Sequence, residues 1–278
     1  SAERLSQALS IAEHTKKLNA DAVAHGSTGA GNDQVRFDMI FNIMIPGVEI
    51  ITPIRDMKLS REEEITYLKS KGVEMNFEKS AYSINKGLWG TSVGGKETLN
   101  SKGMLPESAW PTQVTKTGSE EVKLHFVKGE LFGVNDKTFT HPTEAIQYLQ
   151  TIAGAYGVGR DIHVGDTIIG IKGRVGFEAA APMVILKAHH ALEKHVLTKW
   201  QLNWKDQLAL FYGNWLHEGQ IMDPVMRDIE AYFTNSQQNV TGDVFVQLNP
   251  YHFQVIGIES EFDLMSAKFG KYGEMNTG

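Results

Sequence analysis

The sequence contains no cysteine among its 278 residues, which excludes disulfide bridges and thiolate metal sites. No apolar run approaches the roughly 20 residues that span a bilayer, so we expect no membrane as a partner. Basic residues are also too few to dominate the charge, because 27 Lys and Arg stand against 33 Asp and Glu, a formal net charge of −6. A mildly acidic chain has no general attraction for nucleic acid, so we expect no nucleic acid as a partner.

Apolar residues, at 41% of the chain, are sufficient for a sizeable core in one large domain or two. The absence of cysteine agrees with a reducing cytoplasm, and a cytoplasmic location is our expectation.

The segment His25–Phe37, HGSTGAGNDQVRF, carries the strongest functional signal. A short apolar run, Ala22–Ala24, leads into a glycine-rich turn, and Asn32 and Asp33 then open a helical pattern. Backbone N–H groups and the helix dipole at such a junction suit a phosphate or carboxylate. Turn chemistry supports equally well a tight turn in which Asn32 or Asp33 only caps the helix.

Alternating helical and strand patterns up to about Gly72 predict an α/β domain with a parallel sheet, specifically the second half of a doubly wound nucleotide-binding domain. We expect helices ending near Leu18, over 32–44 and ending near Gly72, with strands at 22–24 and 48–54.

The pattern after Gly72 predicts an α+β domain. We expect a hairpin of strands 122–126 and 130–134, strands at 166–172, 244–248 and 253–258, and helices over 143–156, 180–195, 205–215 and 224–238.

Three blocks of sequence together resemble the argininosuccinate synthase family. HGSTGAGNDQVRFD is similar to its aspartate- and nucleotide-binding loop, YSINKGLWGTSVGG at 82–95 to its citrulline loop, and GVGRDIHVGDTIIGIKGRVGFE at 157–178 to the segment that closes the pocket. The blocks occur in the family's order, and the resemblance covers essentially the whole chain.

The resemblance implies a nucleotide-binding domain of the adenine nucleotide alpha hydrolase type over 1–75 and a synthetase domain over 76–278. It also implies an internal piece of a homotetrameric enzyme, without the family's N-terminal loop for the ATP pyrophosphate and its C-terminal helix. The implied reaction joins aspartate to citrulline in arginine biosynthesis. ATP, carrying Mg²⁺, adenylates the ureido oxygen, and AMP and pyrophosphate are the products.

By resemblance, His25 and Gly26 bind ATP, and Thr28, Asn32 and Asp33 bind aspartate. Asn32 and Asp33 are also the candidate catalytic residues, with Asp33 pairing with the aspartate ammonium group. No metal held by the protein itself is expected.

The residues that match the family's citrulline site are Asn32, Arg36, Ser83, Ser92 and Ser1. Arg36 suits a carboxylate, although a surface charge is its ordinary role on a helix. Serines in a glycine-rich loop are otherwise turn formers.

Three positions of the implied pocket differ from the family. Gly165 stands where the family has a glutamate, Phe177 where it has a tyrosine, and Lys86 where it has an acid. Glycine in place of the glutamate removes the counter-charge for the citrulline ammonium group and opens volume, which favours an N-acylated citrulline. Lys86 would suit a succinyl group. Alternatively, Asp166 or Glu178 replaces the missing carboxylate and free citrulline remains the substrate.

Other interpretations stay open. The chain could be a catalytically degenerate paralogue that serves as an amino-acid-binding or oligomeric scaffold. One helix carries His189, His190, Glu193 and His195. This cluster could form a metal site, but an amphipathic helix is the stronger interpretation. An aromatic stretch contains Trp200, Trp204, Phe211, Tyr212 and Trp215. It indicates a part of the core or a subunit interface more than a surface on which bases stack.

Overall fold

The computed structural model describes residues 2–29, 31–59, 61–73, 82–266 and 272–273. The chain divides into two compact units, each assembled from three stretches of sequence. Unit 1 contains Ser1–Ser80, Gly165–Gly173 and Leu208–Ile229, and unit 2 contains Ala81–Val164, Arg174–Gln207 and Glu230–Gly278.

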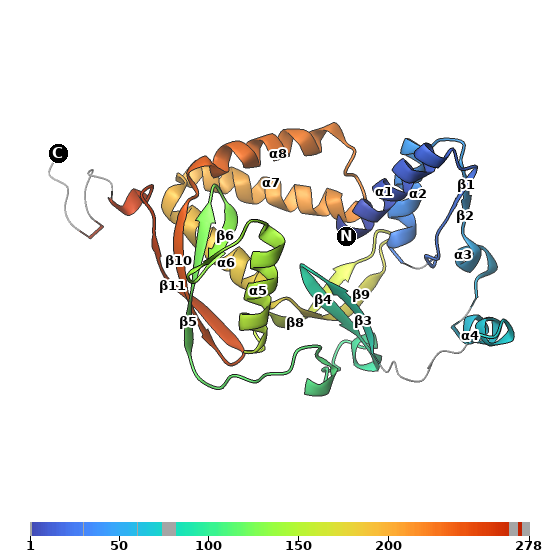
Figure 1. Ribbon diagram of the computed structural model, residues 1–278, viewed down its shortest axis with the longest axis horizontal. Helices are drawn as coiled ribbons and strands as arrows, with labels where there is room; N and C mark the ends of the chain where they lie inside the picture. The colour runs from blue at the N-terminus through green and yellow to red at the C-terminus, as the bar shows by residue number, and fades with distance from the viewer. Residues whose placement is uncertain (1, 30, 60, 74–81, 267–271, 274–278) are drawn as a thin grey trace. The chain divides into compact units, whose positions relative to one another are not determined.

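Unit 1 begins with the predicted alternation of helices and strands (Figure 1). Its elements are α1 (Ala2–Leu18), β1 (Ala22–Ala24), α2 (Asp33–Met44), β2 (Glu49–Ile51), α3 (Pro53–Met57) and α4 (Arg61–Ser70). Strands β1 and β2 pair in parallel, with Val23 opposite Ile50, as a parallel sheet requires. The core forms where α1 and α2 face each other: Leu5, Ala8, Ala12, Val23, Phe37, Ile40, Phe41 and Ile45 are buried.

The strand expected over 48–54 is shorter than predicted. Pro53 lacks a backbone N–H and has a fixed φ, so it suits the first position of a helix and begins α3. The Thr52 hydroxyl donates to the Asp56 carboxylate at 2.8 Å across the first turn of α3. The strand is only partly buried, with Ile51 43% exposed.

Unit 2 is built on a five-stranded antiparallel sheet in the order β11-β10-β5-β6-β7. The strands are β5 (Glu120–Val127), β6 (Glu130–Val134), β7 (Lys137–Thr138), β10 (Gly242–Asn249) and β11 (His252–Glu259). Lys128 and Gly129 both adopt positive φ, 49° and 84°, which is the geometry of a type I′ turn. The predicted hairpin is therefore confirmed, as is the pairing of the last two strands.

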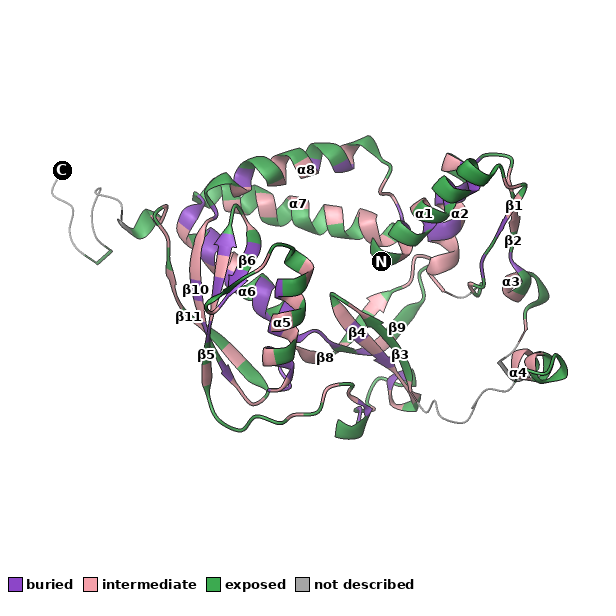
Figure 2. Ribbon diagram, viewed as in Figure 1, coloured by how far each residue is buried: buried purple, intermediate pink, exposed green. Residues whose placement is uncertain are grey.

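Helices α5 (Pro142–Gly154) and α6 (Ala180–Val196) pack against this sheet and bury the main core (Figure 1; Figure 2). The buried positions of α6 recur at helical spacing, so the predicted amphipathic helix is confirmed. Glu193 is the exception, because it is fully buried on the core side. Its carboxylate accepts from Lys205 Nζ at 2.7 Å and Gln237 Nε2 at 2.8 Å.

A second sheet has the order β3-β4-β9-β8. Its strands are β3 (Ser83–Gly87), β4 (Gly90–Gly94), β8 (Arg160–Asp166) and β9 (Lys172–Glu178). The strand expected at 166–172 is wrong, because most of that segment is the turn between β8 and β9. Thr167 N–H donates to Ile171 O at 2.8 Å, and Gly170 has a φ of 85°, which closes the turn. Antiparallel strands with separate helices confirm the α+β class of this part.

Two further helices are α7 (Lys199–Glu218) and α8 (Pro224–Ser236). The 3-10 turns are η1 (Lys96–Leu99), η2 (Glu107–Ala109), η3 (Gln237–Asn239) and η4 (Leu264–Ser266). Helix α7 has no fully buried residue within the described chain, and Trp200, Trp204 and Phe211 are each more than half exposed (Figure 2). The aromatic stretch is thus not core. Among the described residues, no helix combines the length and apolarity needed to cross a membrane.

Candidate active site

The side chain of His25 supports the glycine-rich loop between β1 and α2 from the side of the core. This ring is 4% exposed and stacks on Phe37 with ring centroids 5.3 Å apart. Its Nε2 pairs with Asp38 Oδ1 at 3.0 Å, and its Nδ1 accepts the Ser27 N–H at 3.3 Å. Arg55 Nη1 binds the other oxygen of Asp38. The His25 ring therefore supports the loop on the side of the core. The backbone of the loop stays open to a ligand on its other side.

The loop keeps its backbone accessible at Gly26. A Cβ atom placed there would find only Ile54 Cγ1, at 4.0 Å, so the protein leaves the space beside Gly26 open. Thr28 lies in the following turn, where its carbonyl accepts from Gly31 N–H at 3.4 Å. Both residues are exposed, so a ligand could reach their backbone atoms.

Asn32 occupies the N-cap position of α2, but its side chain makes no capping hydrogen bond. Its Oδ1 instead accepts the backbone N–H of Ile168 at 2.8 Å. The interpretation of Asn32 as a simple cap is therefore wrong. Asn32 joins the motif loop to the turn of the third motif, 136 residues later, and both belong to unit 1.

Asp33 and Arg36 form one ion-paired cluster. Asp33 Oδ1 lies 2.9 Å from Arg36 Nη1, and Asp33 Oδ2 lies 3.1 Å from Arg4 Nε on α1. The Arg36 side chain is 5% exposed, whereas that of Asp33 is 38% exposed. Asp33 thus presents its carboxylate to solvent while neutralising a buried guanidinium group.

Arg36 is consequently not the surface charge that an isolated helix position suggests. Burial lowers the pKa of Arg36, and the charge of Asp33 partly restores it. Arg36 Nε also donates to the backbone oxygen of His217 at 2.9 Å, and Nη2 donates to His217 Nδ1 at 3.3 Å. The end of α7 therefore completes this cluster.

The two predicted serines of the second motif lie on one face of a hairpin. In the β3–β4 register Asn85 is opposite Ser92, and Ser83 is two pairs further along, opposite Gly94. Residues opposite one another, and those two positions along, share a face of a sheet. In the β4–β9 register Ser92 is opposite Phe177. Ser83, Asn85, Ser92 and Phe177 therefore share one face.

Phe177 covers the turn of this hairpin. A Cβ at Gly90, whose φ is 132°, would come within 2.6 Å of the Phe177 ring. Lys86 is opposite Thr91, one position out of phase with Ser92, and so lies on the other face of the sheet. The register therefore gives Lys86 no direct route to the face that carries Phe177.

The remaining pocket positions lie in or near the third motif. Gly165 lies in β8 and belongs to unit 1. Asp166 is exposed and pairs with Lys172 Nζ at 2.7 Å. Glu178 is 4% exposed, pairs with Arg160 Nε at 3.3 Å and accepts the Thr112 N–H at 3.4 Å. Ser1, the fifth predicted citrulline contact, lies outside the described residues.

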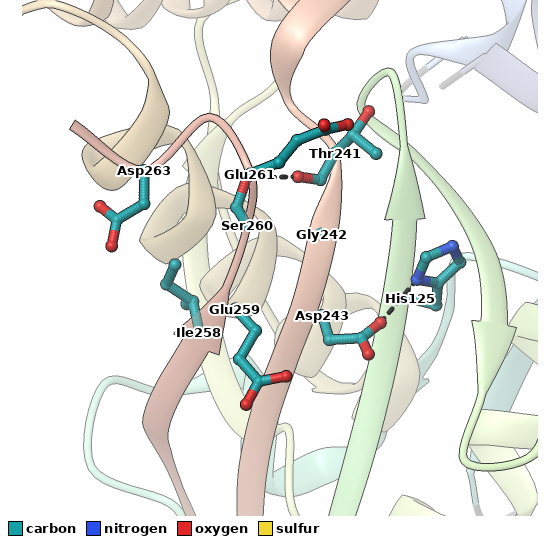
Figure 3. Close-up of a pocket in the computed structure, with 9 residues that line it drawn as sticks. All are labelled: His125, Thr241, Gly242, Asp243, Ile258, Glu259, Ser260, Glu261 and Asp263. Carbon is teal, nitrogen blue, oxygen red and sulfur yellow. Dashed lines mark hydrogen bonds and ion pairs between the residues drawn. The ribbon is translucent and has the colours of Figure 1, made fainter. Parts of the chain in front are cut away.

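A pocket of about 620 Å³ opens elsewhere, on unit 2 (Figure 3). It is lined by His125, Thr241, Gly242, Asp243, Ile258, Glu259, Ser260, Glu261 and Asp263. His125 Nδ1 lies 2.5 Å from Asp243 Oδ1, and this pair points along the wall of the pocket (Figure 3). None of the predicted site residues lines this pocket, and its acidic groups share no part of the three motifs.

Two protein-family models together match most of the chain. The model of the arginosuccinate synthase N-terminal HUP domain matches residues 3–74, and that of the arginosuccinate synthase C-terminal domain matches residues 82–277. The chain belongs to the argininosuccinate synthase family. Members of this family are carbon–nitrogen ligases of arginine biosynthesis that bind ATP.

Individual argininosuccinate synthases align along nearly the whole chain. That of Methanocaldococcus jannaschii is 38% identical over 267 residues, which is 95% of this chain and 67% of the relative. The argininosuccinate synthase of Sulfolobus acidocaldarius is 32% identical over 265 residues, 95% of this chain and 68% of the relative. That of Dictyoglomus thermophilum is 36% identical over 267 residues, 94% of this chain and 66% of the relative. The chain therefore spans about two thirds of these relatives.

Several residues around the candidate site were not identified from the sequence. Arg4 and His217 lie 29 and 181 residues from the α2 residues that they contact, and no spacing rule connects them. Asp38 and Arg55 form the pairs beneath the loop. Asn85 could have been found, because a hairpin closed by Gly87 and Gly90 places it opposite Ser92.

Proposed function

We propose that this protein is an argininosuccinate synthase that acts on a citrulline-type ureido substrate, aspartate and ATP. The observation that carries the proposal is the ion pair between the half-exposed Asp33 carboxylate and the buried Arg36 guanidinium in the first turn of a helix whose N-cap position is Asn32. This set offers a carboxylate to the ammonium group of one amino acid and a guanidinium to the carboxylate of another.

In the proposed reaction the ureido oxygen attacks the α-phosphorus of ATP and pyrophosphate leaves. The resulting citrullyl-adenylate has a good leaving group on its ureido carbon. The aspartate amine then attacks that carbon, loses a proton, and AMP departs. ATP would bring Mg²⁺ on its phosphates. The protein mainly orients three substrates, and correct orientation accounts for much of the rate in such reactions.

The roles of individual residues follow from their surroundings. We assign Gly26 and the backbone of His25 to the nucleotide, because the space beside Gly26 is open. Thr28, Asn32 and Asp33 are assigned to aspartate, with the Asp33 carboxylate pairing with its ammonium group. Arg36 is assigned to the carboxylate of the ureido substrate.

The hairpin face described above is assigned to the ureido substrate, through the hydroxyls of Ser83 and Ser92. Ser1 keeps its proposed place in the same subsite. The proposed division into a nucleotide-binding domain over 1–75 and a synthetase domain over 76–278 puts Ser83 and Ser92 in the second domain and the other assigned residues in the first.

We further propose that the ureido substrate is N-acylated, with N-acetyl- or N-succinyl-citrulline as the candidates. A free α-ammonium group needs a carboxylate partner in a closed pocket. Gly165 supplies none, Asp166 is paired with Lys172, and Glu178 is buried against Arg160. Phe177 has an aromatic ring without a hydroxyl, so it offers an acyl group apolar contact in place of a hydrogen bond. The burial of Glu178 against Arg160 argues against the alternative that this carboxylate substitutes for the missing one.

The exposed aromatic side chains of α7 support a proposal about assembly. Trp200, Trp204 and Phe211 are each more than half exposed, and aromatic residues are enriched in protein interfaces. We propose a homotetramer in which this helix contributes to a subunit contact.

The test is pyrophosphate release by the full-length protein with aspartate, ATP and each of three ureido substrates: free, N-acetyl- and N-succinyl-citrulline. We expect kcat/KM for one acylated form to exceed that for free citrulline by at least about tenfold, or roughly 1.4 kcal/mol. Equal or better use of free citrulline would defeat the acylated substrate and leave the synthase intact. Release with none of the three would defeat the synthase itself and favour the scaffold.

A further inference from the structure

Helix α7 ends in a way that exposes one of its carbonyl groups to the active-site cluster. Gly219 has a φ of 91°, its N–H donates to Leu216 O at 3.3 Å, and Gln220 N–H donates to Trp215 O at 2.8 Å. These two bonds are those of a Schellman motif. The motif satisfies the carbonyls of Trp215 and Leu216, and the carbonyl of His217 accepts from Arg36.

The end of α7 is fixed in unit 1 by apolar packing. Leu216 and Ile221, on either side of the cap, pack against the core formed by α1 and α2. The turn at Gly219 comes close to α2, since a Cβ at Gly219 would lie 3.6 Å from Arg36 Cα. His217 is thus held beside Arg36 by the core as well as by its own hydrogen bonds.

The ring of His217 connects Arg36 to the third motif. Its Nδ1 accepts from Arg36 Nη2 at 3.3 Å, and the ring is also hydrogen-bonded to the backbone of Asp166. A ring nitrogen that accepts from a guanidinium carries no proton, so the imidazole is neutral in this arrangement. Burial lowers the pKa of His217, and the nearby Arg36 charge lowers it further, which agrees with a neutral ring.

The guanidinium of Arg36 is therefore bound on two sides by fixed groups. His217 provides both its backbone oxygen and its ring nitrogen, and Asp33 provides a carboxylate oxygen. The negative end of the α7 dipole also faces this cation. Asp33 is committed to aspartate in the proposed function, so His217 is the group that fixes how Arg36 meets the other amino acid.

We infer that His217 is a positioning residue for the ureido substrate. It orients the Arg36 guanidinium toward the substrate carboxylate, and it ties that guanidinium to the segment that carries Gly165. The inference rests on the proposed function and deepens it. Loss of the ring contact should weaken binding of the ureido substrate and should spare aspartate and ATP.

The experiment compares His217→Phe and His217→Gln in the full-length protein by pyrophosphate release. Phenylalanine keeps a flat ring but loses the acceptor, whereas glutamine keeps an acceptor and a donor. We expect His217→Phe to raise the KM for the best ureido substrate at least tenfold, with the KM values for aspartate and ATP changed less than threefold. His217→Gln should recover the ureido KM to within threefold of wild type.

His195→Phe is a matched control, because His195 is also a last-turn histidine, on α6 in unit 2, and pairs with Asp263 at 3.1 Å. It should leave all three KM values within twofold of wild type. Thermal unfolding of each variant measures any general damage. An unchanged ureido KM in His217→Phe, or an equal rise for all three substrates, overturns the inference.

A double-mutant cycle tests whether His217 acts through Arg36. In an Arg36→Lys background, His217→Phe should change the ureido KM by less than twofold, because the group that it orients is already altered. If turnover is too slow, calorimetric binding of the ureido substrate gives the same comparison. A full tenfold effect in that background overturns the inference. If the wild-type protein forms no product with any ureido substrate, the proposed function and this inference fail together.

Discussion

The two parts of the proposed site are organised in opposite ways. In unit 1, the side chains are placed by contacts between distant segments: Arg36 meets His217 across 181 residues, and Asn32 meets Ile168 across 136. In unit 2, Ser83 and Ser92 are placed by the register of one local hairpin. The first arrangement depends on the whole unit being folded, and the second depends mainly on one turn.

The difference has an energetic consequence. A buried ion pair that loses one partner leaves an uncompensated charge, so the cluster around Arg36 should respond to substitution as a unit. Residues on the hairpin face meet few buried charges, so substitutions there should act locally. Substitutions in the two regions can therefore test whether the contrast holds.

The largest effect is expected for Asp33→Asn. Loss of a charge-assisted contact costs roughly 1.5–3 kcal/mol, which corresponds to about a 10- to 150-fold rise in the aspartate KM. The KM for ATP should change much less, and Tm should fall because Arg36 loses its counter-charge. Asp21→Asn, at an exposed position of the same unit, is the control. An aspartate KM within twofold of wild type would remove Asp33 from its proposed role.

A somewhat smaller effect is expected for Gly165→Glu. A carboxylate at this position restores a partner for an α-ammonium group and fills space that an acyl group would need. We expect the ratio of kcat/KM for acylated over free citrulline to fall by about tenfold, or roughly 1.4 kcal/mol. Gly165→Gln adds nearly the same volume without the charge, so it separates the two causes. An unchanged ratio in both variants would contradict the role of Gly165.

Acid should destabilise unit 2 through His189. Burial lowers the pKa of His189 below its ordinary value of 6.5, and the charge of Glu193 only partly opposes this. Below pH 6.5 the unfolded chain therefore binds more protons than the native chain. The contribution of His189 to the free energy of unfolding is fully present above that pH, and it is lost as the pH falls toward the pKa of His189 in the folded protein.

Calorimetry between pH 7.5 and 5 measures this effect. We expect the fall in Tm on acidification to be a few degrees smaller in His189→Gln than in wild type. His252→Gln, at an exposed position on β11, should keep the wild-type slope. Identical slopes for wild type and His189→Gln would count against the burial argument.

The smallest effect is expected at Lys86. The register places this side chain on the face opposite Ser92 and Phe177. Lys86→Ala should therefore change the preference among free, N-acetyl- and N-succinyl-citrulline by less than twofold. A selective loss of N-succinyl-citrulline use would show that the lysine reaches the substrate after all.

The sequence was sufficient to predict the structure wherever local backbone preference and apolar spacing determine it. The turn at Lys128 and Gly129 and the amphipathic helix α6 follow from backbone preference and apolar spacing, and both were predicted. Prediction was wrong where a single residue outweighed a pattern. Pro53 ended a strand that β-branched residues had suggested, and Gly170 turned the chain inside an expected strand.

The proposed site was less accessible to prediction. The motif residues of the loop were identified only through resemblance, since the Asn32 side chain by itself suggested a helix cap. His217 and Arg4 could not be found from the sequence, because their roles depend on which segments meet in the folded unit. Once the pairing of the hairpin is known, the alternation of side chains along a strand predicts which face of the sheet carries Lys86.

The assembly of unit 1 from three separated stretches has a consequence for how the chain is made. Contacts between residues far apart in sequence form late, because a long loop must close before they can stabilise anything. During synthesis, the partners of Arg36 and Asn32 emerge long after the loop itself. The nascent chain therefore carries Arg36 with its guanidinium still in solvent, and the apolar face of α2 stays incompletely covered until the later segments emerge.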